Sequence, residues 1–188
     1  LLMNNGGKSF TDITEQAGVG DARWGTSAAF GDLDNDGDLD LYVCNYLEFD
    51  SKNPPPRAKY KGTSVLGGPH GMIPESDIVY ENMGDGAFSD ATEAWQLDAP
   101  PAFSLNVVIL DVDGDGMQDI YVGNDSMANF LFKNNGRNSG ERFIQEGIHS
   151  GLAVNGDGSM QATMGIAIAD VDGSGSPDFF TTNFSSDT

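Results

Sequence analysis

The sequence predicts an all-β protein, a β-propeller of four-stranded blades with a calcium-binding loop between the first and second strands of each blade. Three observations predict this fold. An acidic loop occurs three times between short apolar segments of strand type. A hairpin pattern around Asn or Asp and Gly also recurs three times. The acidic loops start at residues 32, 111 and 170, so 79 and 59 residues apart, and four-stranded units at such a period are typical of propellers.

The acidic loops share the pattern Asp-x-Asp-x-(Asp or Ser)-Gly-x-x-Asp. Their carboxylates would repel one another in a folded chain unless a cation lay among the oxygens. Oxygen ligands in a short loop with a turn-forming glycine suit Ca²⁺, which takes about 6–8 oxygens. The backbone carbonyl of the seventh position can add a ligand, and the last Asp can close the shell. The candidate ligands are Asp32, Asp34, Asp36, Asp38 and Asp40 in the first loop, Asp111, Asp113, Asp115, Met117 and Asp119 in the second, and Asp170, Asp172, Ser174, Ser176 and Asp178 in the third.

We therefore expect up to three Ca²⁺ ions, one per loop. The third loop should bind most weakly, because Ser174 takes the place of a carboxylate. An EF-hand is excluded, since it needs Glu at position 12 and a helix on each side. Position 12 is Val43, Val122 or Thr181, each in a segment of strand type.

In chain order, the sequence predicts one partial propeller over residues 1–188. Residues 1–24 form the end of one blade, 25–103 a blade with an insertion at 48–77, 104–162 a further blade, and 163–188 the start of the next. This is about three blades, whereas propellers close with about 4–8. We expect a seven-blade parent, completed by the rest of the propeller or by a neighbouring chain.

The insertion is rich in Pro and Gly and is expected to be irregular. It carries His70 and several of the basic residues. Two interpretations stay open: a loop folded over one face of the propeller where partners dock, or a passive cover.

Composition narrows the class of partner. The chain has 9 Lys and Arg against 29 Asp and Glu, a formal charge of −20. Nucleic acid and anionic membranes are disfavoured, because both need basic patches. No apolar run approaches the roughly 20 residues that span a bilayer, so no membrane insertion is expected. Cys44 is the single cysteine, which excludes an internal disulfide and favours a buried strand thiol.

An asparagine lies 13 residues after the first Asp of each loop, at Asn45, Asn124 and Asn183. The second and third also form sequons, Asn124-Asp125-Ser126 and Asn183-Phe184-Ser185. They could be glycosylated or could cap a turn. We favour the cap, because it also accounts for Asn45, which has no sequon.

The loop pattern after a small-residue strand, as in Phe30-Gly31-Asp32, resembles the FG-GAP/VCBS repeats of calcium-binding β-propellers, the fold of the integrin α-subunit head. Three stretches, Asp40 to Asp50, Tyr80 to Phe88 and Thr182 to Asp187, resemble more closely the mainly bacterial group similar to cartilage acidic protein, whose members often end in an ASPIC/UnbV module. The 188 residues given do not include that module, and their insertion lacks the cysteine pair that relatives often carry there. The resemblance implies an extracellular, cell-surface or periplasmic protein.

Two functions are weighed. One is a calcium-stabilised module in adhesion or structure that binds protein or glycan partners. The alternative is a propeller-fold enzyme, such as a polysaccharide lyase, which needs an acid and a base converging in one cleft. Its candidates are few: Arg57, Tyr60, His70 and His149. We favour the binding module and assign no catalytic residue.

Overall fold

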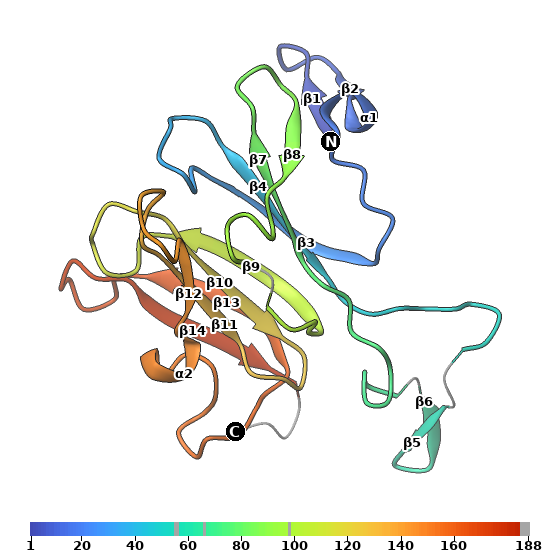
Figure 1. Ribbon diagram of the computed structural model, residues 1–188. Helices are drawn as coiled ribbons and strands as arrows, with labels where there is room; N and C mark the ends of the chain where they lie inside the picture. Colours follow the sequence, from blue (N-terminus) through green and yellow to red (C-terminus); the bar gives the residue numbers. More distant parts are fainter. Residues whose placement is uncertain (55–56, 66, 98, 185–188) are drawn as a thin grey trace.

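The computed structural model describes residues 1–54, 57–65, 67–97 and 99–184, and it confirms an all-β chain (Figure 1). Two four-stranded antiparallel sheets follow each other along the sequence. The first contains β3 (Gly25–Gly31), β4 (Asp40–Asn45), β7 (Ile78–Asn82) and β8 (Phe88–Asp90). The second contains β9 (Ser104–Leu110), β10 (Asp119–Asn124), β11 (Phe130–Asn134) and β12 (Phe143–Gln145).

The remaining elements are short. Three two-stranded sheets pair β1 (Leu2–Asn4) with β2 (Phe10–Asp12), β5 (Ala58–Tyr60) with β6 (Thr63–Val65), and β13 (Thr163–Ala169) with β14 (Asp178–Asn183). One-turn helices α1 (Thr14–Ala17) and α2 (Gly147–Ser150) each end at a left-handed glycine. None of the helices described is long and apolar enough to cross a membrane.

Strand pairing places the three acidic loops in equivalent positions. Each loop joins the first and second strands of its sheet, and the strand pairs next to the loops are Gly31 with Asp40, Leu110 with Asp119, and Ala169 with Asp178. Each of these loop-joined strand pairs also has a register shift near the end remote from the loop. The strands predicted on both sides of the loops, and the three hairpins, are therefore confirmed.

The sheets stack face to face through their first strands, with β3 against β9 and β9 against β13 (Figure 1). This arrangement is consistent with part of a β-propeller. The number of blades in the parent stays a prediction.

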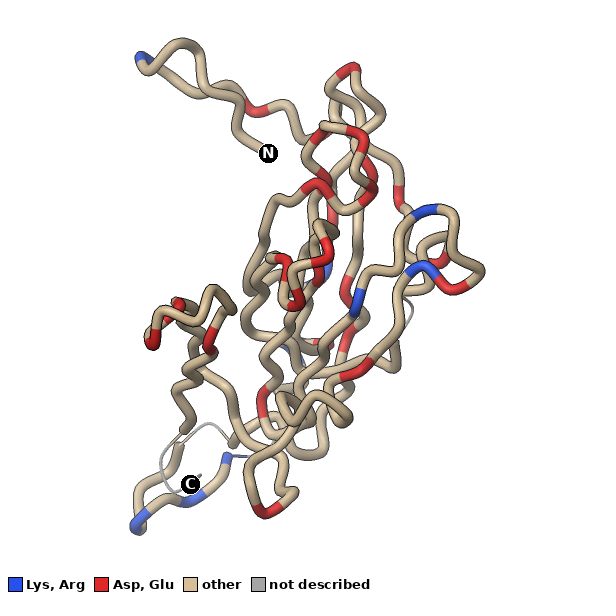
Figure 2. Tube along the Cα trace, turned by 90° about the vertical axis from the view of Figure 1, so that its left-hand side faces the viewer, with Lys and Arg blue, Asp and Glu red and all other residues tan. Residues whose placement is uncertain are grey.

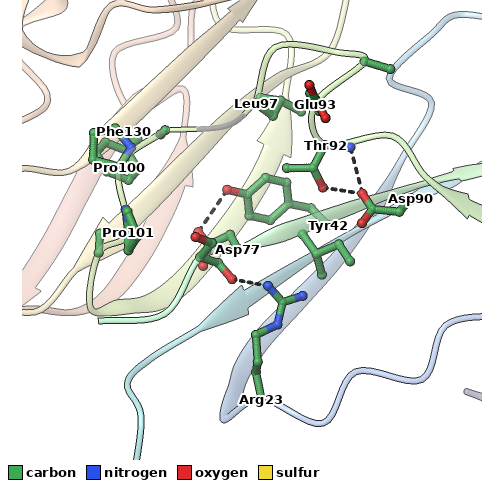
Figure 3. Close-up of a pocket in the computed structure, with 15 residues that line it drawn as sticks. Arg23, Tyr42, Asp77, Asp90, Thr92, Glu93, Leu97, Pro100, Pro101 and Phe130 are labelled. Atoms are coloured by element: carbon green, nitrogen blue, oxygen red, sulfur yellow. Dashed lines mark hydrogen bonds between the residues drawn. The ribbon is translucent and has the colours of Figure 1, made fainter. Parts of the chain in front are cut away.

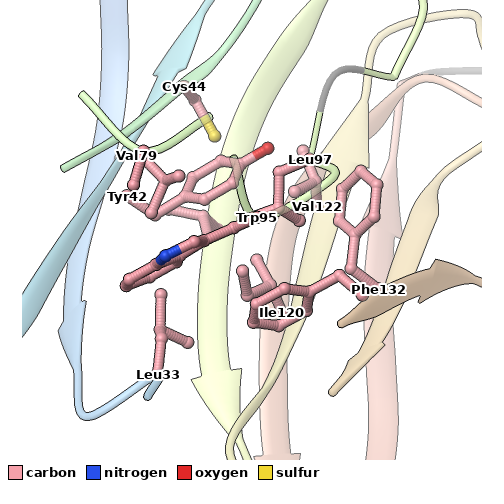
Figure 4. Close-up of a cluster of buried hydrophobic side chains, with 12 residues drawn as sticks. Leu33, Tyr42, Cys44, Val79, Trp95, Leu97, Ile120, Val122 and Phe132 are labelled. Atoms are coloured by element: carbon pink, nitrogen blue, oxygen red, sulfur yellow. The ribbon is translucent and has the colours of Figure 1, made fainter. Parts of the chain in front are cut away.

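The main hydrophobic core lies between the two four-stranded sheets (Figure 4). Tyr42 and Val79 meet Ile120 and Phe132, with Trp95 packed among them from the connection between the sheets. Cys44 is fully buried in this cluster, as expected of a strand thiol, and burial raises its pKa. Burying this apolar surface is the main favourable contribution to the stacking.

The insertion differs from the expectation of an irregular loop, because it contains the β5–β6 hairpin. Lys61 and Gly62 form its two-residue turn, with φ of 48° and 84°. Two-residue hairpin turns of this kind need positive φ at both positions, which glycine adopts freely. Leu47 forms a bridge with Pro74, so the start and end of the insertion lie side by side.

Candidate metal-binding loops

The acidic residues of the protein gather in turns of the chain, whereas basic residues are few (Figure 2). Three such turns are the predicted loops. In each, carboxylate oxygens of three aspartates lie within 4.8 Å of one another. The sets are Asp32, Asp34 and Asp36; Asp111, Asp113 and Asp115; and Asp170, Asp172 and Asp178.

The first Asp of each loop folds the loop around itself. Its side chain accepts hydrogen bonds from the backbone N–H groups of the fifth and sixth positions: Asp36 and Gly37 at 3.1 Å to Asp32, for example. Asp111 and Asp170 accept the equivalent bonds. These N–H donors stabilise the ionised carboxylate, so the pKa of Asp111 is lowered.

The last Asp of the first and second loops anchors each loop to the third strand of its sheet. Asp40 Oδ2 accepts the N–H of Leu33 at 2.9 Å, and Asp40 Oδ1 accepts the N–H of Asn82 on β7 at 2.9 Å. Asp119 makes the same two contacts, with Val112 and with Asn134 on β11. Burial raises the pKa of Asp40 to about 6. Both oxygens of these two aspartates are thus held by backbone donors, and their service as metal ligands stays a prediction.

The seventh position supplies its backbone rather than its side chain. The N–H of Met117 donates to Asp115 Oδ1 at 2.8 Å, and the N–H of Asp38 donates to Asp36 Oδ1 at 3.0 Å. In the third loop the N–H of Ser176 donates to Ser174 Oγ at 3.3 Å. The serine hydroxyl therefore supports the turn as a carboxylate does, but it brings no charge.

Two positions in each loop have left-handed backbone. The sixth was expected from its glycine, and Gly37, Gly116 and Gly175 have φ between 88° and 97°. The left-handed fourth position was not predicted. Asn35 has φ 59° there, and the equivalent residues are glycines with φ of 76° and 74°. Asn and Gly are the residues that adopt this conformation at least cost, so the sequence held the signal.

The loops differ in burial. Asp34 is buried and burial raises its pKa, whereas the three aspartates of the third set are exposed. A buried carboxylate gains most from a cation, because burial weakens the solvation of its charge. An all-oxygen donor set of this kind fits a hard divalent cation such as Ca²⁺.

A cleft of about 960 Å³ separates the first two sheets at another point (Figure 3). Asp77 lies in it, and Asp77 Oδ2 accepts hydrogen bonds from the Tyr42 hydroxyl at 3.0 Å and the Ser104 hydroxyl at 2.9 Å. Arg23 reaches the same wall and donates to the carbonyl of Ser76 at 2.7 Å. Burial raises the pKa of Asp77 to about 6. Sequence reasoning missed Asp77. A signal was present, because the equivalent position of the next sheet, just before β11, also holds a polar residue, Asn129.

The residues considered for catalysis do not line either of the cavities described. Arg57, Tyr60, His70 and His149 are exposed, and none lines this cleft or the smaller cavity of about 160 Å³ between β10 and β14.

Of the three equivalent asparagines, Asn124 caps a turn, whereas Asn45 and Asn183 bond to more distant segments. Asn124 is fully buried, its Nδ2 donates to the carbonyl of Ala128 at 2.7 Å, and its Oδ1 accepts the Ser104 hydroxyl at 3.0 Å. Asn45 Nδ2 donates to Asp21 and to the carbonyl of Ser76. Asn183 donates to Gln161. The buried Asn124 amide has no room for a glycan in the folded chain.

Comparison with known proteins adds the family. A comparison with curated proteins gives no match. A model of the FG-GAP repeat matches residues 24–64. A model of the FG-GAP-like repeat matches residues 1–43, 71–122 and 111–181, well over half of the chain. The protein therefore belongs to the FG-GAP-like repeat family.

Proposed function

We propose that this chain is a calcium-stabilised β-propeller module that binds protein or glycan partners at an extracellular, cell-surface or periplasmic location. The observation that carries the proposal is the threefold repetition of one oxygen-lined loop with the same hydrogen bonds. FG-GAP repeats often bind Ca²⁺, are typical of extracellular proteins and are typically non-catalytic binding modules. Within the family, we assign the chain to the VCBS-type, ASPIC/UnbV-associated group.

In each loop, the carboxylates at the first, third and fifth positions would hold the ion, with the carbonyl of the seventh position and the last Asp. In the third loop, Ser174 offers a neutral oxygen. A bound Ca²⁺ supplies two positive charges, which offset the repulsion among the carboxylates and link the two strands that flank the loop. Its role here is structural, since it stabilises the folded loop by binding that state alone.

Partner binding is proposed for the opposite end of the strands. Trp24 precedes β3 and Tyr46 follows β4, so both lie at the end of the sheet remote from the first acidic loop. Trp24 contacts Tyr46 and Phe49 edge to face, with ring centroids 5.9 Å and 5.4 Å apart. Trp24 and Phe49 are each 47% exposed, beside the start of the insertion. Exposed aromatic side chains of this kind are enriched at binding surfaces.

The rest of the propeller, or a neighbouring chain, is proposed to cover the last strand pair. Tyr42 and Tyr121 occupy equivalent positions on β4 and β10 and are 2% and 1% exposed, each under the next sheet. Phe180, at the same position on β14, is 67% exposed. A further sheet stacked on β14 would bury it in the same way.

Thermal unfolding with and without calcium tests the metal. We expect the melting temperature to rise with Ca²⁺ and to fall with a chelator. Calcium modules outside cells bind at about 10⁻⁴–10⁻³ M, and free Ca²⁺ at about 100 times Kd stabilises by about 2.7 kcal/mol per site. A melting curve that ignores both Ca²⁺ and chelator would disprove calcium stabilisation.

Deletion of residues 53–71, alone and combined with Phe49→Ala, tests the binding face that the exposed aromatic residues and the insertion would form together. The protein should keep its calcium response but lose retention on immobilised glycans or partner proteins. Loss of folding instead would favour a passive cover.

A further inference from the structure

We infer that Arg137 and Lys133 are built-in counter-ions of the first and second acidic loops, and that each competes with the metal for the carboxylate at the third position. This inference rests on the proposed calcium binding. It concerns the chain's own cations, of which only nine are present against 29 acidic residues. Two of those nine are directed at acidic loops.

Arg137 reaches the first loop from the neighbouring sheet. It lies in the connection between β11 and β12, and its Nη2 forms an ion pair with Asp34 Oδ2. The Asp34 side chain is 1% exposed and the Arg137 side chain is 51% exposed, so the pair joins a buried carboxylate to a guanidinium at the surface. Arg142 adds a second positive charge close to Asp34, and Asp36 adds a negative one.

The same connection also holds the backbone of the first loop. Asn134 Nδ2 and Arg142 Nη2 both donate to the carbonyl of Leu33, at 2.8 Å and 3.1 Å. The loop is therefore fixed in place by the next sheet even without a metal. A buried Asp34 without Arg137 would be an uncompensated charge, which is costly.

Lys133 serves the second loop from within its own sheet. Its ammonium on β11 forms an ion pair with Asp113 Oδ2. Both side chains are partly exposed, at 26% and 39%, so solvent screens this pair more than the first. In the third loop, none of the basic residues in the described chain forms an ion pair with Asp170, Asp172 or Asp178.

These ion pairs act against the ranking of calcium affinities that the number of carboxylates alone predicts for the three loops. Counting carboxylates makes the first loop the strongest site and the third the weakest. A cation entering the first loop must, however, share or displace a guanidinium, and one entering the second an ammonium. The third loop meets no such competitor. Competition should therefore narrow the spread of affinities, most of all by weakening the first loop.

Calcium titration of the full chain by calorimetry tests this. Arg137→Gln should tighten binding at one site about tenfold, equivalent to about 1.4 kcal/mol. Lys133→Gln should tighten another about threefold, because its pair is more exposed. Lys59→Gln, an exposed lysine of the insertion with no ion pair, is the matched control for loss of one charge and should change nothing. Adding Asp32→Ala to Arg137→Gln should abolish the tightened site and so identify it as the first loop.

Melting temperatures separate competition from a merely structural role. In chelator, Arg137→Gln should melt below the unaltered protein, because Asp34 is left unpaired. In saturating Ca²⁺ the difference should vanish or reverse. Equal losses in both conditions, with unchanged calcium affinity in both variants, would overturn this inference and leave calcium binding intact. If the unaltered protein binds no Ca²⁺, both this inference and the proposed calcium binding are overturned. Lys133→Gln removes a partly exposed ion pair, so this variant still tests competition with the metal if Arg137→Gln does not fold.

Discussion

The two places where sheets stack can be compared residue by residue. The first seam lies between the sheet β3-β4-β7-β8 and the sheet β9–β12, and the second lies between β9–β12 and the pair β13–β14. Each buries a tyrosine beside a polar residue. At the first seam the Tyr42 hydroxyl donates to Asp77, and at the second Asn129 Nδ2 donates to the Tyr121 hydroxyl at 2.9 Å. Asp77 and Asn129 also accept the N–H of Asn45 and Asn124, both at 2.8 Å.

The seams differ in what surrounds this shared pattern. The first encloses a cleft of about 960 Å³ and the second a cavity of about 160 Å³. At the second seam, Tyr121 donates to the carbonyl of Leu152, which helps to close the space. The residue at the second position of the acidic loop is also buried to a different extent at the two seams. Leu33 in the first loop is 1% exposed, whereas Val112 in the second is half-buried. Strand and turn are thus repeated locally, whereas burial depends on the neighbour.

The largest expected effect is at Leu33. Leu33→Ala should lower the free energy of unfolding by about 3 kcal/mol, because it leaves a cavity in the core of the first seam. Val112→Ala, the equivalent change at the second seam, should cost about 1 kcal/mol or less. Urea denaturation in chelator measures both. Equal losses would show that Val112 is buried as deeply as Leu33, by a further part of the protein.

The next effect concerns the partly buried carboxyl of Asp77. Its folded pKa of about 6 lies above the usual 3.8, so its contribution is fully present below pH 4 and is lost as pH rises through 6. Asp77→Asn should remove this loss, worth about 2–3 kcal/mol between pH 4 and 7.5.

The converse change at the second seam is the control. Asn129→Asp should introduce the same pH dependence there, with lowest stability near neutral pH. Unfolding free energies in chelator across this pH range check both variants. A parallel pH profile for Asp77→Asn and the unaltered protein would contradict the expected titration.

Close backbone approach gives a smaller effect at each seam. A Cβ on Gly31 would overlap Ile109 Cγ2, and one on Gly123 would lie 2.7 Å from Thr163 Cγ2. Gly31→Ala and Gly123→Ala should each cost about 2 kcal/mol. Gly25→Ala, where the nearest atoms are 3.9 Å away, should be close to neutral in the same denaturation experiment. A neutral Gly123→Ala would mean that the second seam packs less tightly than its first strands suggest.

The smallest expected effect compares loops. In Ca²⁺, Asp111→Ala should lower the melting temperature by a few degrees, and Ser174→Ala by less. Asp111 accepts three backbone N–H bonds and carries a charge for the ion, while the Ser174 hydroxyl accepts one such bond and carries no charge. A larger loss for Ser174→Ala would contradict the expected ranking of the sites.

The sequence by itself determined the repeated local structure. Alternating aspartates, a sixth-position glycine and flanking β-branched segments specify the turn and its two strands through contacts within about ten residues. The all-β class, the hairpins and the three acidic sets could therefore be predicted. The left-handed fourth position was also readable, because Asn35, Gly114 and Gly173 all tolerate positive φ.

Only the tertiary structure decided what each repeat meets. Arg137 lies 103 residues from Asp34, and no local pattern pairs them. Asp77 and Asn129 look like ordinary loop residues until the sheets stack, which buries Asn129 and partly buries Asp77. Val171 occupies the same position as Leu33, yet it is 79% exposed instead of 1%. Burial, and the ion pair of Arg137 with Asp34, come from the sheet that packs alongside, and long-range packing of that kind is not encoded in the repeat.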